Sequence, residues 1–173
     1  MRNNKGLVMV NTGPGKGKTT AALGTALRAA GRGLKVMILQ FIKGRETGEF
    51  KSIELLPNVE YRQFGRGMIR SRSDTSVDEE LARNAWKECQ TAVLSKKYDL
   101  VILDEICLAL HYGFLNTSEV VAFLRAKPEQ VHIIITGRYC PPEVLAVADT
   151  VTQMEMVKHH YSNGVKAIPG IEY

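Results

Sequence analysis

The sequence has few cysteines, few aromatic residues and no long hydrophobic run. Cys89, Cys107 and Cys140 are odd in number and widely separated, so they predict neither a disulfide framework nor a paired set of metal ligands. The apolar runs are too short for a membrane span or for the core of a signal peptide. We therefore predict a cytoplasmic protein with no membrane partner, whose thiols are reduced and mostly buried.

Aromatic side chains make up only 7% of the chain. Because polynucleotide binding favours aromatic platforms and a long basic groove, and neither is evident, no nucleic-acid partner is expected. The net charge of +5 and the pI near 9.2 also fit a protein that grips a polyphosphate. With 173 residues, 45% of them hydrophobic, the chain is expected to form one domain, residues 1–173, that buries roughly 70% of its unfolded surface.

One stretch, TGPGKGKTT at residues 12–20, lies between a short apolar segment and an alanine-rich helical pattern. A strand, a glycine-rich turn and a helix N-terminus form a cradle for phosphate, because backbone N–H groups and the helix dipole favour an anion there. Lys18 is expected to reach phosphate oxygens, and the Thr19 hydroxyl to hold a bridging Mg²⁺. The predicted ligand-binding residues of this loop are Gly13, Pro14, Gly15, Lys16, Gly17, Lys18, Thr19 and Thr20.

The loop departs from the common spacing GxxxxGK[ST] at its first position. That spacing places a glycine at position 12, where this chain has Thr12, and the first glycine follows at Gly13. The loop is therefore effectively one residue tighter, and we expect a triphosphate to lie in it differently. The alternative is a glycine-rich turn that binds nothing, which the Gly-Lys-Thr-Thr sequence between strand and helix disfavours.

A second chemical landmark is the segment YDLVILDE at residues 98–105. Its apolar strand ends in Asp104 and Glu105, which matches the Walker B pattern, whose carboxylates hold or orient Mg²⁺ beside a phosphate loop. Alone the pattern is weak, since any buried strand can end in an acid, but downstream of Gly-Lys-Thr it is strong. We predict a metal site made by Thr19, Glu105 and Asp104.

Two basic residues follow other predicted strands, Lys43 after residues 35–41 and Arg138 after residues 132–136. The carboxyl ends of parallel strands line the ligand crevice of an open α/β sheet, so both residues are candidate contacts of the nucleotide. The alternatives are a solvated lysine and a surface salt bridge. The basic segment 65–74 is either a loop over the crevice that meets an anionic ligand or a solvated connection.

Strand and helix patterns alternate along the chain and predict an α/β fold, with a mostly parallel sheet flanked by helices on both faces. Ser76 to Glu79 fits a capping box at the start of a long helix. His159 and His160 are expected to point in opposite directions in an extended segment, which disfavours a shared metal site. Predicted helices cover residues 19–30, 49–56, 76–96, 106–112, 118–126 and 142–148, and predicted strands cover residues 7–10, 35–41, 59–64, 98–105, 132–136 and 150–157.

In combination, these segments resemble the P-loop ATP:corrinoid adenosyltransferases, which act on cob(I)alamin and cob(I)yrinic acid a,c-diamide. The resemblance implies a P-loop NTPase-like (RecA-like) fold. It also implies transfer of the 5′-deoxyadenosyl group of ATP to the Co(I) centre of a reduced corrinoid, with release of triphosphate. It covers nearly the whole chain in the family's order, through TGPGKGKTTAALGTALRAAGRG, VMILQFIKG, YDLVILDEI, HIIITGR, ADTVTQM and VKHHYSNGVKAIPGIEY.

The resemblance further implies roles and partners. Gly13 to Thr19 would bind the ATP triphosphate, with the nucleotide reversed relative to ordinary P-loop ATPases. Lys16, Lys18 and Glu105 would act in catalysis by neutralising the leaving triphosphate together with Mg²⁺, while Asp104 supports the metal ligands or a metal-bound water. ATP and a corrinoid are the expected substrates, a flavoprotein is the expected reductant of cobalt, and a homodimer is the expected assembly.

The chain departs from the family's pattern in two places. Family members often carry a Phe-x-Trp pair, thought to displace the lower ligand of the corrinoid, where this chain has Met68 and Arg70. They also usually carry a longer N-terminal segment that helps to cover the corrin ring. Both differences concern the corrinoid side of the site, where Met68 and Arg70 are the candidate residues.

Two other classes of function compete with this interpretation. One is a nucleic-acid-stimulated or regulatory P-loop ATPase that cleaves the β–γ bond of ATP, with Glu105 orienting water. The other is a nucleotide-gated binding module without chemistry, whose loop around Arg70 docks a partner. The products distinguish the three, because adenosyl transfer gives triphosphate, hydrolysis gives ADP and phosphate, and a binding module gives neither.

Overall fold

A computed structural model describes residues 5–42, 44, 47–67 and 74–172 of the chain. Its six strands form one sheet in the order β3-β2-β4-β5-β1-β6, and every neighbouring pair is parallel. The predicted α/β fold with a parallel sheet is therefore confirmed. Within the described residues, every helix is too short or too polar to cross a bilayer.

The elements follow the predicted alternation closely, with most boundaries within two residues. The strands are β1 (Val8–Thr12), β2 (Val36–Gln40), β3 (Val59–Gln63), β4 (Leu100–Asp104), β5 (His132–Thr136) and β6 (Thr150–Gln153). The helices are α1 (Lys18–Ala30), α2 (Gly48–Ile53), α3 (Ser76–Leu94), α4 (Ile106–His111), α5 (Thr117–Ala126), α6 (Pro142–Leu145) and the 3₁₀ helix η1 (His160–Asn163).

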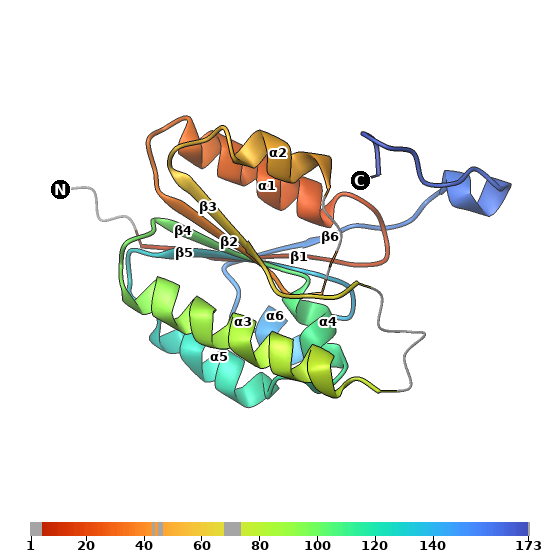
Figure 1. Cartoon of the computed structure of the whole chain (residues 1–173). Helices are drawn as coiled ribbons and strands as arrows, with labels where there is room; N and C mark the ends of the chain where they lie inside the picture. Colours follow the sequence, from red (N-terminus) through yellow and green to blue (C-terminus); the bar gives the residue numbers. More distant parts are fainter. Residues whose placement is uncertain (1–4, 43, 45–46, 68–73, 173) are drawn as a thin grey trace.

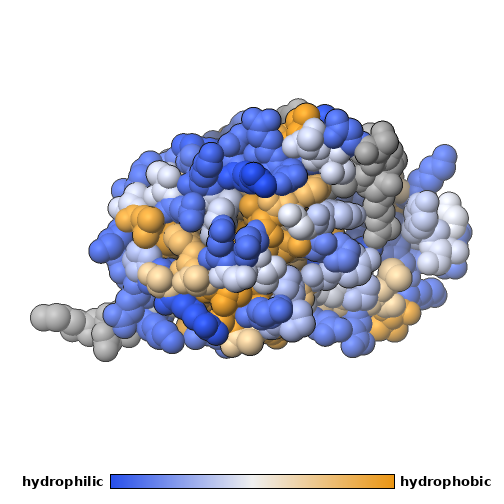
Figure 2. All heavy atoms as spheres, turned by 90° about the horizontal axis from the view of Figure 1, so that it is seen from below, coloured by the Kyte–Doolittle hydropathy of each residue, from blue (hydrophilic) through white to orange (hydrophobic). Residues whose placement is uncertain are grey.

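Helices cover both faces of the sheet, as Figure 1 shows, with α1 and α2 on one side and α3 to α6 on the other. Successive strand residues point to opposite faces, so Ile38 and Ile102 pack under α1 while Leu39 and Leu103 pack under α3 and α4. This two-sided burial explains the continuous apolar strands. Seen from the α3–α6 side, hydrophilic side chains cover much of the surface, with apolar ones between them (Figure 2).

The strand order places three chain turns side by side at the carboxyl edge of the sheet. Strand β5 lies between β1, which leads into the glycine-rich loop, and β4, which ends in Asp104. Thr12 at the end of β1 donates a hydrogen bond of 2.8 Å to the Gly137 carbonyl, which follows β5. The loop, the acidic turn and the turn after β5 are thereby brought together.

Two local predictions were wrong. The last strand ends at Gln153 rather than near residue 157, because the following backbone leaves the sheet and packs against the glycine-rich loop. The capping box at Ser76 does not form, because Ser76 is already helical and its N–H donates to Asp74, while the Glu79 carboxylate accepts from Arg83 one turn later.

The two-sided core gives a test of stability. We expect Ile133→Ala, in the middle of the sheet and fully buried, to lower the free energy of unfolding by about 2–5 kcal/mol, because it leaves a cavity that neighbouring strands cannot fill. Val151→Ala on the edge strand, where the side chain is 45% exposed, serves as the control and is expected to cost less than about 1 kcal/mol. Urea denaturation measures both, and equal losses would contradict the described packing.

Candidate active site

The glycine-rich loop between β1 and α1 is shaped by contact with the chain after β6. A Cβ on Gly13 would lie 2.5 Å from the Met154 carbonyl oxygen, and one on Gly15 would lie 2.6 Å from that of Glu155. The Gly15 N–H donates to the Met154 oxygen at 2.7 Å. Gly17 has a φ of 101°, a left-handed conformation that favours glycine. Close backbone approach and backbone conformation thus account for the alternating glycines.

Lys18, the first residue of α1, lies inside this loop rather than in solvent. Its side chain is folded back so that Nζ donates to the Gly13 and Gly15 carbonyl oxygens, at 2.8 and 2.6 Å. Only 7% of the residue is exposed. The ammonium group is therefore held at the centre of the loop, where the α1 N-terminus adds its partial positive charge.

The Asp104 carboxylate joins the loop helix to the sheet. Its Oδ1 accepts from the Thr19 hydroxyl at 2.8 Å and from the Thr136 hydroxyl at 2.6 Å, and its Oδ2 accepts from Gln40 Nε2 at 2.8 Å. The residue is 1% exposed. Each of these hydroxyls and the amide donates its proton to the carboxylate, so Asp104 sets the orientation of the Thr19 hydroxyl.

The polar network continues across the sheet to its far edge. Gln40 Oε1 accepts from the Tyr61 hydroxyl at 2.8 Å and from Gln63 Nε2 at 2.9 Å, both on β3. Burial, and then the negative charge of Asp104, raise the pKa of Tyr61 well above its ordinary value, so this phenol stays neutral and donates. Side chains from three strands therefore fix the Asp104 carboxylate in one orientation.

Glu105 precedes α4 as its N-cap residue and has a strained backbone conformation. Its φ of 64° lies in the left-handed region, and its N–H donates to the Thr136 hydroxyl at 3.0 Å. Its Oε2 lies beside Gly137, where an added Cβ would approach it to 3.3 Å. Such strain is stored at functional sites more often than elsewhere. From this turn the Glu105 side chain lines the cavity next to the loop.

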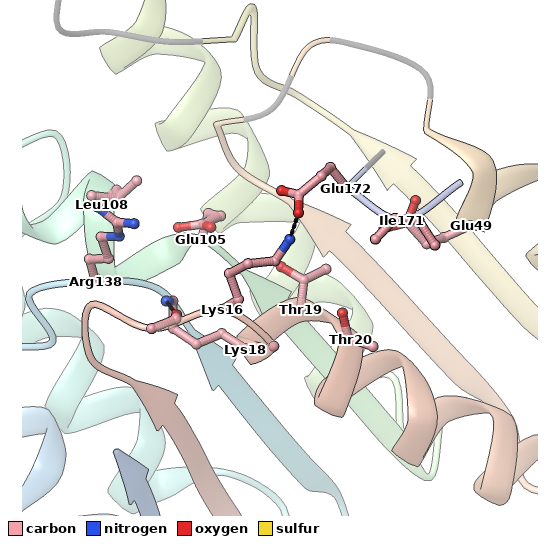
Figure 3. Close-up of a pocket in the computed structure, with 12 residues that line it drawn as sticks. Lys16, Lys18, Thr19, Thr20, Glu49, Glu105, Leu108, Arg138, Ile171 and Glu172 are labelled. Atoms are coloured by element: carbon pink, nitrogen blue, oxygen red, sulfur yellow. Dashed lines mark hydrogen bonds and ion pairs between the residues drawn. The ribbon is translucent and has the colours of Figure 1, made fainter. Parts of the chain in front are cut away.

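These groups surround a cavity of about 220 Å³ (Figure 3). Leu108 and Arg138 lie on one side of it, and Glu49, Ile171 and Glu172 lie on the other, with the loop lysines and Thr19 between them. The lining residues are Gly15, Lys16, Gly17, Lys18, Thr19, Thr20, Glu49, Glu105, Leu108, Arg138, Ile171 and Glu172.

The carboxyl-terminal segment brings an acid to this cavity and a histidine beside that acid. Glu172 forms an ion pair with Lys16, and its Oε1 lies 3.4 Å from His160 Nε2. Partial burial, followed by the charges of His160, Lys16 and Arg138, holds the pKa of His159 below its ordinary value. The prediction that the two histidines point apart was wrong, because η1 starts at His160 and sets the rings 4.5 Å apart.

The structure brings most of the predicted site residues together. Gly13 and Pro14 belong to the loop but do not line the cavity, and Asp104 lies beneath it as a support for Thr19. Lys43, Met68 and Arg70 lie outside the described residues. Five further residues at the site were not predicted, because no local pattern assigns chemistry to them: Glu49, Leu108, Thr136, Ile171 and Glu172. Thr136, Ile171 and Glu172 lie in the segments HIIITGR and IPGIEY, which carry the family resemblance.

A parallel sheet with a glycine-rich loop, an invading lysine and a threonine held by the acid of a neighbouring strand defines a P-loop nucleotide-binding fold. The family model described as ATP:corrinoid adenosyltransferase BtuR/CobO/CobP matches residues 4–173. The chain therefore belongs to the ATP:corrinoid adenosyltransferase family.

Named relatives and solved structures agree with this assignment. The chain is 38% identical to a corrinoid adenosyltransferase of Pseudomonas aeruginosa over 99% of its own length and 86% of the relative's. It is also 38% identical to that of Escherichia coli K12, covering 99% and 88%, and 37% identical to corrinoid adenosyltransferase CobA of Salmonella typhimurium, with the same coverage.

The solved structures bear on the fold alone, since their sequences are remote. A KaiC-like protein from Pyrococcus horikoshii has a TM-score of 0.56 at 16% identity, covering 90% of this chain and 75% of that one. The flagellar accessory protein FlaH from Methanocaldococcus jannaschii has a TM-score of 0.56 at 14% identity, covering 86% and 70%. The predicted P-loop NTPase-like fold is confirmed, and the family favours adenosyl transfer over the competing ATPase.

The same substitution is expected to lower ATP affinity at a glycine of the loop and to raise fold stability at a glycine of α1. We expect Gly15→Ala to weaken ATP binding at least about tenfold, because the new methyl group would push the loop off the Glu155 backbone. Gly24→Ala, at an exposed position of α1 with no heavy atom within 4 Å, is the matched control and should stabilise the fold by about 0.5–1 kcal/mol. Calorimetric titration and thermal denaturation measure the two effects, and undiminished affinity in Gly15→Ala would contradict the loop's role.

Proposed function

We propose that this protein transfers the 5′-deoxyadenosyl group of ATP to the cobalt of a reduced corrinoid and releases triphosphate. The Co(I) centre supplies the electron pair for the new cobalt–carbon bond. The bond between C5′ and the triphosphate oxygen breaks, and its electron pair stays with the leaving triphosphate. Because the nucleophile comes from the substrate, the protein needs no activated serine, cysteine or base of its own. Its tasks are to align the two substrates and to stabilise the charge that develops on triphosphate.

The proposal rests on one structural observation, the composition of the cavity, in a chain that belongs to the ATP:corrinoid adenosyltransferase family. One cavity combines the loop amides, two lysines and Arg138 with the Thr19 hydroxyl and Glu105. Its lining carries three cations, Lys16, Lys18 and Arg138, and three carboxylates, Glu49, Glu105 and Glu172, so it is a polar site with cations for a polyphosphate rather than an apolar pocket. Positive side chains there stabilise the leaving triphosphate, whose charge increases as the carbon–oxygen bond breaks.

Each basic group has a distinct position toward the triphosphate. Lys18 is buried and already points into the loop, so we assign it the main contact with the leaving group. Lys16 is partly exposed at the cavity edge, and Arg138 approaches from the side of α4. An arginine there offers paired donors for a phosphate oxygen or the ribose. Lys43 is retained as a further candidate contact, and Met68 and Arg70 are retained on the corrinoid side.

The donors present also fit a Mg²⁺ ion. Thr19 presents a hydroxyl oxygen at the helix N-terminus, and Glu105 presents a carboxylate that also lines the cavity. Mg²⁺ prefers one or two protein oxygens together with phosphate oxygens. We assign Thr19 and Glu105 to this ion and Asp104 to the orientation of Thr19. When bound, the ion would neutralise charge on the triphosphate.

The reaction products test the proposal. The full chain is incubated without oxygen with ATP, Mg²⁺ and a chemically reduced corrinoid, and the visible spectrum and phosphate products are followed. Adenosylated corrinoid with triphosphate in equal amounts is the expected result. ADP with phosphate would instead indicate β–γ hydrolysis, and the absence of turnover would indicate a binding module.

Lys18→Ala tests the leaving-group role. We expect the transfer rate to fall by at least about a hundredfold, because the positive charge nearest the developing triphosphate charge is lost. Lys87→Ala, at an exposed position of α3 far from the loop in sequence, removes the same charge and should leave the rate unchanged. A normal rate in Lys18→Ala would remove the loop from the mechanism.

The proposals on assembly, reductant and location rest on the family resemblance and the sequence rather than on the cavity. A homodimer and a flavoprotein reductant are carried over from the resemblance, and a cytoplasmic location stays a prediction from the sequence. Light scattering of the purified chain tests the homodimer directly. A reduced flavoprotein that replaces the chemical reductant in the transfer assay would identify the source of the electrons.

A further inference from the structure

The carboxyl-terminal segment lines one side of the phosphate cavity. After η1 the chain returns to the loop, and Ile171 and Glu172 line the cavity beside it. Figure 3 shows the Glu172 carboxylate directed at the Lys16 ammonium group, with which it forms an ion pair. A carboxylate thus neutralises one of the cations of an anion-binding site.

This segment is held by its acid rather than by a buried apolar face. Glu172 has a side chain that is only 16% exposed, whereas the neighbouring Ile171 is 74% exposed and Ile168 is 46% exposed. Segments that bury little apolar surface open locally at a small cost in free energy. The carboxyl-terminal segment, hereafter the tail, can therefore leave the cavity while the sheet and its helices remain folded.

A triphosphate and Glu172 require the same ammonium group. A ligand that uses Lys16 must first displace the carboxylate, since one exposed ammonium cannot serve both anions at full strength. The carboxylate also lines the cavity, so its charge repels a bound polyphosphate for as long as the tail stays in place. Binding of triphosphate and closure of the tail are therefore opposed.

The competition between the carboxyl-terminal segment and triphosphate bears on product release. Every contact that stabilises the leaving triphosphate in the transition state also holds the free product, and slow release then limits turnover. A carboxylate that takes back Lys16 reduces the loss of interaction when the product departs. We propose that Glu172 competes with the triphosphate for Lys16 and thereby promotes release of that product, an inference that rests on the proposed function.

Polyphosphate binding tests the competition without any corrinoid. Titration calorimetry of the full chain with sodium tripolyphosphate and Mg²⁺ compares the natural sequence with Glu172→Gln. We expect the dissociation constant of the variant to be about two- to fivefold lower, the effect of losing a partly exposed ion pair that opposes binding. Tripolyphosphate should also inhibit the transfer reaction more strongly in the variant, by a similar factor.

Two controls isolate the effect to Lys16. Glu143→Gln, at an exposed position in the first turn of α6 and outside the cavity, removes the same charge and should leave the dissociation constant unchanged. In a Lys16→Gln background, adding Glu172→Gln should produce no further gain, because the competition acts through that ammonium group.

The outcomes separate this inference from the proposed function. An unchanged or higher dissociation constant in Glu172→Gln, an equal gain in Glu143→Gln, or a persisting gain without Lys16 would each overturn the competition. If the natural chain binds tripolyphosphate and carries out adenosyl transfer in those cases, the proposed function stands alone. If the natural chain binds neither tripolyphosphate nor ATP, both fail together.

Discussion

The arrangement of the site depends on one buried acid. Asp104 receives hydrogen bonds from the first turn of α1, from the end of β5 and from the end of β2. Its burial makes those three bonds costly to lose, because a carboxylate removed from water needs donors in compensation. The acid therefore fixes the loop helix against the sheet and holds Thr19 at the wall of the cavity.

The parts of this fold that are encoded locally could be predicted from the sequence. Continuous apolar strands, such as β2 and β4, predict a sheet that is covered on both faces. The sequence Gly-Lys-Thr-Thr between a strand and a helix predicts an anion-binding loop. Most of the loop residues and Glu105 accordingly line one cavity, and Asp104 supports Thr19 beneath it. These features could be predicted because each is specified by the residues of one continuous segment.

The rest depended on contacts between distant segments. Met154 shapes the loop and Glu172 pairs with Lys16, yet neither residue stands in a pattern that specifies its partner. Local signals also lost to alternatives nearby, as when Asp74 took the Ser76 N–H that a capping box would have satisfied. Strand order, which sets Thr136 between the loop and the Walker B acid, is likewise decided only by the assembled sheet.

The dependence of the glycine-rich loop on the backbone after β6 affects how the protein is made. Strand β6 pairs with β1 at the edge of the sheet, and the Gly15 N–H finds its acceptor in Met154, which is synthesised long after the loop itself. A nascent chain on the ribosome thus carries the loop sequence long before it can give that loop its final shape. The shape that this loop has in the folded protein therefore forms only after β6 and Met154 have been added to the chain.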